Sequence, residues 1–122
     1  MSADSSKPYE RLERLFHEPN RLAIMSAVCG AGEGLTFTEI KESCDLTDGN
    51  LSRHLKVLDE AGAVQITKMF VDNKPRTTVV VSEDGLSSFV GYLRALEDVL
   101  KSAEESLGTA RSRLNLPGTL GA

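Results

Sequence analysis

The side chains best suited to bind a polyanion are gathered in two short segments of the chain. Residues 47–61 carry hydrogen-bonding and cationic side chains, and residues 64–82 carry further cations. Amide, hydroxyl and guanidinium groups can read base edges, while lysine and arginine can bind phosphate oxygens. The candidates for contact with nucleic acid are Thr47, Asn50, Ser52, Arg53, Lys56, Lys68, Lys74 and Arg76.

Three leucines define the opposite side of the first segment. Leu51, Leu55 and Leu58 are spaced by four and three residues, so they share one face of a helix. The remaining face is polar, which makes Arg53 the candidate for reading a guanine edge and Lys56 the candidate for a phosphate. The alternative is an ordinary solvated face, since surface helices of charged proteins commonly carry both residue types.

The second segment has the alternating β-branched residues of a β-hairpin. Its cations Lys68, Lys74 and Arg76 are opposed by one acid, Asp72. The sequence from Asp72 to Pro75 favours a turn that projects outward. A charged hairpin tip also protects an edge strand from pairing with other chains, so edge protection is the alternative to phosphate binding.

Catalytic residues are scarce. The only histidines are His17 and His54, and no G-x-S-x-G nucleophile turn is present. We expect His54, which flanks the leucine face, to be packed rather than to act as a base. The glycines from Gly30 to Gly34 lack the Lys-Ser/Thr that follows in a phosphate-binding loop. The sequence therefore predicts no enzyme, no cofactor and no metal site.

The overall charge limits the ways in which the chain could bind nucleic acid. The formal net charge is −4 and the pI is near 5.2, so indiscriminate binding through a cationic excess is not expected. Any affinity must come from a local patch. Neither a membrane-spanning apolar run nor a secretory signal is recognisable, which predicts a cytoplasmic protein without a membrane partner.

Two helices are predicted ahead of these segments. Residues 1–8 are small and polar and are predicted to be disordered. Residues 9–17 have apolar side chains at helical spacing, which indicates a short amphipathic helix. Pro19 suits the first turn of a second helix, and the glycines from Gly30 should end it.

Two further helices form a recognisable pair. Thr36 and Glu39 have the spacing of a capping box and open a short helix over about residues 37–44. Thr47 is a good N-cap for the next helix, residues 47–61. Because so short a break separates the two helices, they should form a helix-turn-helix.

The last helix is predicted over residues 83–114, and residues 115–122 should be disordered. Its leucines recur every seven residues, with apolar residues three positions after most of them, as in a coiled-coil seam. The seam consists of Leu86, Phe89, Leu93, Leu96, Leu100, Ala103, Leu107, Ala110 and Leu114.

A chain of 122 residues is expected to form one domain, too small to cover this whole seam itself. The first half of the seam should pack on the chain's own first helix, and the rest should join two copies of the chain. The predicted dimer-interface residues are Tyr9, Leu12, Phe16, Leu93, Leu96, Leu100 and Leu107.

The run from Leu46 to Gly62, with the Lys-Pro-Arg-Thr of residues 74–77, resembles the MarR/ArsR-type winged-helix transcriptional regulators, especially their short single-domain members. The resemblance covers about residues 16–90. It implies a dimer whose second motif helix enters the DNA major groove. Metal sensors of this broad family carry a cysteine pair where this chain has only Cys44, so metal or thiol sensing is not expected.

These features together predict a mainly α protein with a small β-hairpin, a winged helix-turn-helix over residues 9–114 ending in a long dimerisation helix. Its expected function is sequence-specific binding of a pseudo-palindromic double-stranded DNA operator by a homodimeric transcriptional regulator. The recognition helix would be residues 47–61 and the wing residues 64–82. The alternative is a winged helix that binds other proteins and no specific DNA. The sequence does not indicate whether a small-molecule effector exists.

Overall fold

The computed structural model describes residues 13–115. The described residues divide into two compact units, Glu13–Gly91 and residues 92–115. The final helix, α4 (Glu83–Leu114), is continuous and contributes residues to both units. The predictions of disorder for residues 1–8 and of a helix over residues 9–12 lie outside the described residues, as does the tail after Asn115.

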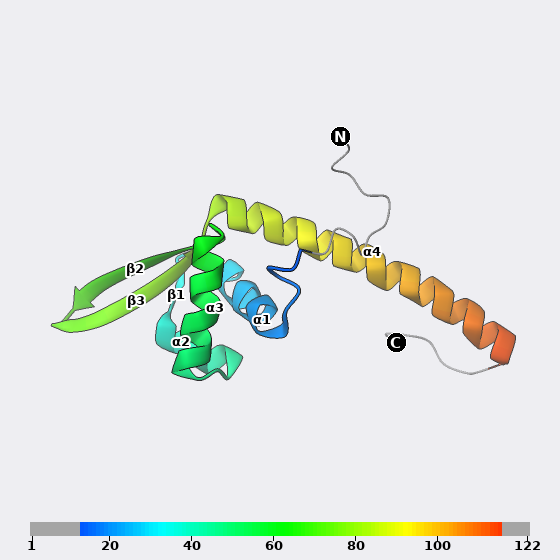
Figure 1. Cartoon of the computed structure of the whole chain (residues 1–122), viewed down its shortest axis with the longest axis horizontal. Helices are drawn as coiled ribbons and strands as arrows, with labels where there is room; N and C mark the ends of the chain where they lie inside the picture. The colour runs from blue at the N-terminus through cyan, green and yellow to red at the C-terminus, as the bar shows by residue number, and fades with distance from the viewer. Residues whose placement is uncertain (1–12, 116–122) are drawn as a thin grey trace. The chain divides into compact units, whose positions relative to one another are not determined.

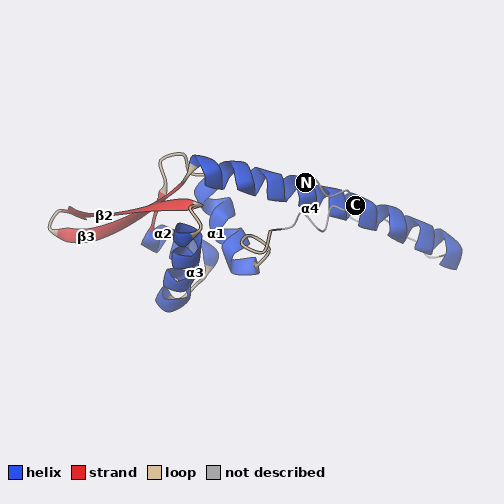
Figure 2. Ribbon diagram, turned by 45° about the horizontal axis from the view of Figure 1, so that its top comes forward, coloured by secondary structure: helices blue, strands red, loops and turns tan. Residues whose placement is uncertain are grey.

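The first unit contains a cluster of three helices and a small sheet, followed by the start of α4 (Figure 1). Its three-stranded antiparallel sheet has the order β1-β3-β2, and the hairpin of the last two strands extends beyond the three helices (Figure 2). The predicted mainly α winged helix-turn-helix, with its long C-terminal helix, is confirmed. The elements before α4 are α1 (Pro19–Cys29), β1 (Leu35–Thr36), α2 (Phe37–Cys44), α3 (Asp48–Glu60), β2 (Val64–Val71) and β3 (Lys74–Val81).

The segment before α1 is a turn, so the prediction of a helix continuing to His17 is wrong for its described part. The Arg21 side chain explains the departure, because its Nε donates to the backbone oxygen of Leu15 at 2.7 Å. The turn also buries Phe16, whose ring meets that of Phe89 edge to face with 5.2 Å between centroids. Tertiary packing therefore overrides the local helical pattern.

Both predicted helix caps of the helix-turn-helix are present. The Thr36 hydroxyl accepts from the Glu39 N–H at 3.1 Å, and the Glu39 carboxylate accepts from the Thr36 N–H at 2.8 Å. At the start of α3 the Thr47 hydroxyl accepts from the Asn50 N–H at 3.2 Å. The end of α3 is a Schellman motif, in which Gly62 adopts the left-handed φ of 78° that favours glycine.

The hairpin is tighter than its sequence predicts. Residues Asp72 and Asn73 have φ values of 54° and 63° and form a two-residue turn of the type whose twist suits a hairpin. Lys74 and Pro75, predicted as part of the turn, belong instead to β3. Strand β1 is not foreseen by the sequence analysis, because two residues are too few to show a periodicity.

The core of the first unit lies among the helices and the base of the sheet. Phe16 has no exposed surface and so has none to bury against a second chain, which removes it from the predicted dimer interface. The other predicted interface residues before α1, Tyr9 and Leu12, lie outside the described residues. The completely buried apolar side chains are those of Phe16, Ile24, Met25, Val28, Ile40, Leu51, Leu58 and Val79.

Candidate nucleic-acid interface

Helix α3 presents a buried face and a polar face, as its spacing predicts. Leu51, Leu55 and Leu58 are buried against the core. The N-cap Thr47 is exposed, and the candidate base and phosphate contacts of the helix all lie on its exposed side. These candidates are Asn50, Ser52, Arg53 and Lys56. The core thus fixes the helix while leaving its hydrogen-bonding groups free to meet a ligand.

The remaining buried side chain of α3, His54, ties the helix to the start of α1. Its Nδ1 lies 3.3 Å from Nη1 of Arg21 and 3.9 Å from Oε1 of Glu18, and its Nε2 lies 3.5 Å from Nδ2 of Asn20. The prediction that His54 is packed is confirmed, and its contacts orient α3 in the unit.

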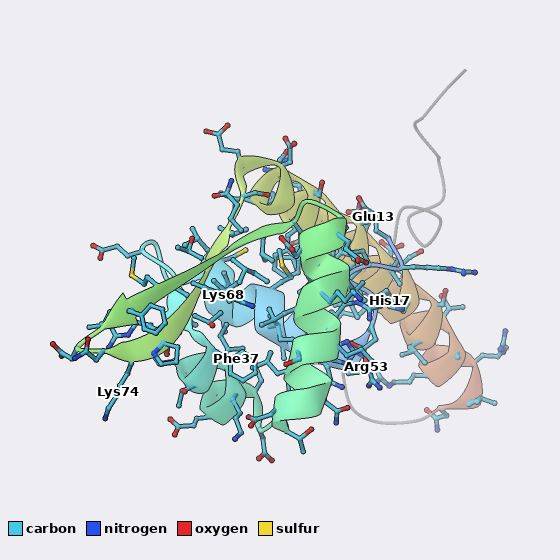
Figure 3. The ribbon with its side chains drawn as sticks, turned by 60° about the vertical axis from the view of Figure 1, so that its left-hand side comes forward. Glu13, His17, Phe37, Arg53, Lys68 and Lys74 are labelled. Carbon is cyan, nitrogen blue, oxygen red and sulfur yellow. The ribbon has the colours of Figure 1, made fainter. Side chains whose placement is uncertain are left out.

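Arg53 and Asn50 are already associated on the exposed side of α3. Nη2 of Arg53 donates to Oδ1 of Asn50 at 3.1 Å, across one turn of the helix. A guanidinium carries five N–H donors, so most of them are still available to a base edge or a phosphate. Figure 3 places Arg53 on the side of α3 away from the hairpin.

A groove of about 630 Å³ lies on the other side of α3, between that helix and the hairpin. Ser52 and Lys56 from α3 and Lys68 from β2 line it, so three of the predicted contact residues meet there. Figure 3 shows Lys68 and Phe37 on this side of α3. The groove is lined by Phe37, Ser52, Leu55, Lys56, Asp59, Ile66, Lys68 and Thr77.

The other two predicted wing cations lie nearer the hairpin tip. Lys74 is the first residue of β3, and Arg76 stands opposite Met69 of β2. Both side chains are exposed. The structure therefore separates the predicted contacts into Arg53 and Asn50 on one side of α3, the groove on the other, and the hairpin tip.

Acidic residues adjoin the same surface. Asp48, in the first turn of α3, forms a 2.9 Å ion pair with Lys41 of α2, while Asp59 lies in the groove and Glu60 is exposed. The ion pair is solvent-exposed and contributes little to stability. The pair nevertheless places the Lys41 ammonium beside Asp48, the first residue of α3.

Comparison of the sequence with models of known protein families identifies the domain that carries this surface. The model of the winged helix DNA-binding domain matches residues 20–100. The chain belongs to this family. It is a family of DNA-binding domains and not of enzymes, as the sequence predicts.

Known proteins share this winged helix over most of its length. An uncharacterized protein of Methanocaldococcus jannaschii is 31% identical over 91 residues, 75% of this chain and 98% of that protein. A transcriptional regulator homologue of Pyrococcus horikoshii is 29% identical, with a TM-score of 0.74, over 82% of this chain and 99% of that chain. MepR of S. aureus, in a DNA complex, has a TM-score of 0.65 at 13% identity, over 91% and 90% of the two chains, which shows a shared fold alone. The winged-helix fold that the resemblance to MarR/ArsR-type regulators implies is confirmed.

Several residues of the groove and of the ion pair beside it are not among the contacts predicted from the sequence. Phe37 and Thr77 line the groove, and Lys41 pairs with Asp48. The sequence offers a signal for Thr77 alone, because the strand alternation places it on the same face as Val79. The positions of Phe37 and Lys41 depend on how α2 packs, which no local pattern reports.

The second unit of this winged helix contributes the remainder of α4, and its predicted interface leucines differ in exposure. Leu93, Leu100 and Leu107 are 40%, 55% and 42% exposed, and Leu96 is half-buried. The exposed leucines are spaced by seven residues, so they follow one side of a long helix. Among the described residues, no helix is long and apolar enough to cross a membrane.

The two cysteines of the winged helix, Cys29 and Cys44, are half-buried free thiols. Burial raises the pKa of Cys29 and that of Cys44 above the ordinary thiol value. A raised pKa lowers the thiolate fraction, and the thiolate is the form that binds metals and attacks electrophiles. Residues 13–115 contain no cluster of three or more histidine, cysteine or acidic side chains able to hold a metal ion.

Proposed function

We propose that this winged helix is a sequence-specific transcriptional regulator that binds a pseudo-palindromic operator as a homodimer in the cytoplasm. Helix α3 enters the major groove, where Arg53 and Asn50 read base edges. The β2–β3 hairpin acts as the wing and follows the backbone into the neighbouring minor groove.

The observation that carries the proposal is the arrangement of donors on both sides of α3. Arg53 is held by Asn50 on one side, and the groove with Ser52, Lys56 and Lys68 lies on the other. When a helix lies in a major groove, the two phosphate backbones run along its flanks. The groove between α3 and the wing therefore offers cations and a hydroxyl to one of these backbones.

Salt dependence tests the DNA-binding part of the proposal. Four candidate phosphate contacts per chain, Lys56, Lys68, Lys74 and Arg76, give about eight in a dimer. Operator affinity should then fall by roughly 10³- to 10⁵-fold between about 50 and 200 mM salt. Lys56→Ala should flatten the dependence, whereas Lys101→Ala on α4 is the matched control and should leave it unchanged. No specific shift at either salt concentration would favour a protein-interaction module instead.

The dimer is supported by the exposed leucines of α4. Leu93, Leu100 and Leu107 leave apolar surface along one side of the helix, and Leu114 adds a side chain that is 62% exposed. Apolar residues at this spacing pair two helices by interlocking side chains, and burial of each leucine stabilises the pair. Two recognition helices related by a two-fold axis would then read half-sites about 34 Å apart.

A charge placed in the seam tests the dimer. Leu100→Asp would bury a carboxylate against its two-fold mate, so the variant should sediment as a monomer with its helical signal retained. Ser102→Asp adds the same charge off the seam and should remain dimeric. A dimeric Leu100→Asp that binds the operator as the wild type does would show that α4 does not form the interface.

A further inference from the structure

The hairpin tip carries the most exposed large apolar side chain of the described residues. Phe70 is 77% exposed, and its neighbour Met69 is 50% exposed. Single exposed apolar residues are common on protein surfaces. A phenylalanine on an edge strand, however, invites pairing with other chains, so its exposure is unfavourable unless a ligand covers it.

Strand register places a second apolar group beside Phe70. Phe70 stands opposite Pro75, one pair beyond Val71 and Lys74, which close the turn. In a two-residue hairpin the pair after the closing pair makes no ladder hydrogen bonds, so the missing N–H of Pro75 is tolerated and the two side chains lie close together. We call Phe70 and Pro75 the wing-tip patch.

The wing-tip patch faces the same way as the groove beside α3. Alternation along β2 places Phe70 on the same side as Ile66 and Lys68, both of which line the groove. Across the hairpin, Thr77 lines the groove and stands opposite Lys68. The patch therefore continues the groove surface toward the tip, whereas Met69 lies on the opposite face of the hairpin.

Charge around the patch matches a polyanion. Lys68 shares the face of the patch, and Lys74 and Arg76 flank Pro75 with side chains on the opposite face, against the single acid Asp72 at the turn. Duplex DNA combines phosphates for the cations with sugars and base edges for the apolar groups.

We propose that the wing-tip patch is an apolar wedge for the DNA minor groove. The inference rests on the proposed operator binding. Phe70, packed beside Pro75, presses against sugars and base edges and partly unstacks one base step. Lys74 and Arg76 hold the flanking phosphates. Wedges of this kind favour flexible pyrimidine–purine steps, so the patch gives the wing a sequence preference without hydrogen bonds to bases.

The test uses the full-length chain and the duplex that the wild type selects from a random pool. Phe70→Ser should weaken binding about tenfold or more, with an unchanged salt slope because no phosphate contact is lost. Phe70→Leu should retain most of the affinity. Met69→Ser, which removes an exposed apolar side chain from the opposite face, is the matched control and should bind as the wild type does.

A fluorescent base analogue reports the wedge directly. 2-Aminopurine at the step under the wing should brighten on binding of the wild type and Met69→Ser, but not of Phe70→Ser. Wild-type affinity and brightening in Phe70→Ser would overturn the wedge while leaving operator binding intact. A wild type that selects no duplex at all would overturn both proposals. Phe70 is exposed, so its loss should leave the thermal unfolding of the protein unchanged, which excludes misfolding as the cause.

Discussion

Gly85 in the first turn of α4 is a position where one methyl group should disrupt the unit. A Cβ built there would overlap the carbonyl oxygen of Ala63 and lie 2.7 Å and 2.8 Å from the carbonyl carbon and Cα of that residue. All three atoms are backbone, so no side chain can rotate away. Gly85→Ala must push α4 and the start of the wing apart by roughly an ångström, because the packed interior has no spare room.

The size of the effect follows from what this shift breaks. Overpacking costs about 1–3 kcal/mol. The Ser82 N–H donates to the Ala63 oxygen at 3.1 Å, and the Ser82 hydroxyl donates to the neighbouring Gly62 oxygen at 2.6 Å. Losing these two bonds costs about 1 kcal/mol each. Replacing glycine by alanine within a helix stabilises the helix by about 1 kcal/mol, which offsets part of this loss. We expect Gly85→Ala to lower the free energy of unfolding by about 2–4 kcal/mol and Tm by roughly 8–16 °C.

The same substitution six residues later is the control. A Cβ at Gly91 meets no atom within 4 Å, so Gly91→Ala should stabilise α4 by up to about 1 kcal/mol. Urea titration and thermal melting followed by circular dichroism measure both variants. If Gly85→Ala proves as stable as Gly91→Ala, then the first turn of α4 does not pack directly against the Ala63 backbone.

Three other measurements probe the site. Arg53→Ala should lose about 1–3 kcal/mol of operator binding in a fluorescence anisotropy titration and tolerate changes at one base pair, with wild-type melting; retained discrimination would mean that Arg53 reads no base. Lys74→Ala and Arg76→Ala should each reduce the slope of log affinity against log salt concentration by about two in a dimer, since each removes one phosphate contact per chain. An unchanged slope would show that the wing tip does not contact the DNA phosphates. Cys29 and Cys44 should react with iodoacetamide more slowly in the folded protein than in denaturant, because burial raises both pKa values. For the same reason the unfolded chain loses these protons first as pH rises, so stability should fall above the ordinary thiol pKa; equal alkylation rates would show that the thiols are not shielded.

Features fixed by neighbouring residues are those that the sequence predicts well. Thr36, Glu39 and Thr47 satisfy backbone groups within three residues of themselves, so their spacing is sufficient to locate two helix starts. The leucine face of α3 likewise follows from helical periodicity. The polar side of α3 is therefore identified before any tertiary contact is known.

Features that depend on distant residues are those that the sequence does not reveal. Strand β1 exists because Leu35 and Thr36 pair with Val79 and Thr78, more than forty residues away. The turn containing Phe16 forms because that side chain packs on Phe89. The partners of His54 come from α1. In each case the local pattern allows several structures, and packing selects one of them.

Net acidity and DNA binding are compatible in this chain because the charges are segregated along it. The wing holds Lys68, Lys74 and Arg76 against one acid, Asp72, and α3 adds Arg53 and Lys56, whereas acids outnumber cations in the remainder of Glu13–Gly91. At physiological salt, charges separated by more than about 8 Å are largely screened, so acids beyond that distance from the duplex affect binding less than the cations that contact it. The acids still reduce attraction to arbitrary DNA, and discrimination then depends on the short-range contacts of α3 and the wing. An acidic regulator of this design should accordingly owe more of its operator affinity to Arg53 and Phe70 than a basic one would.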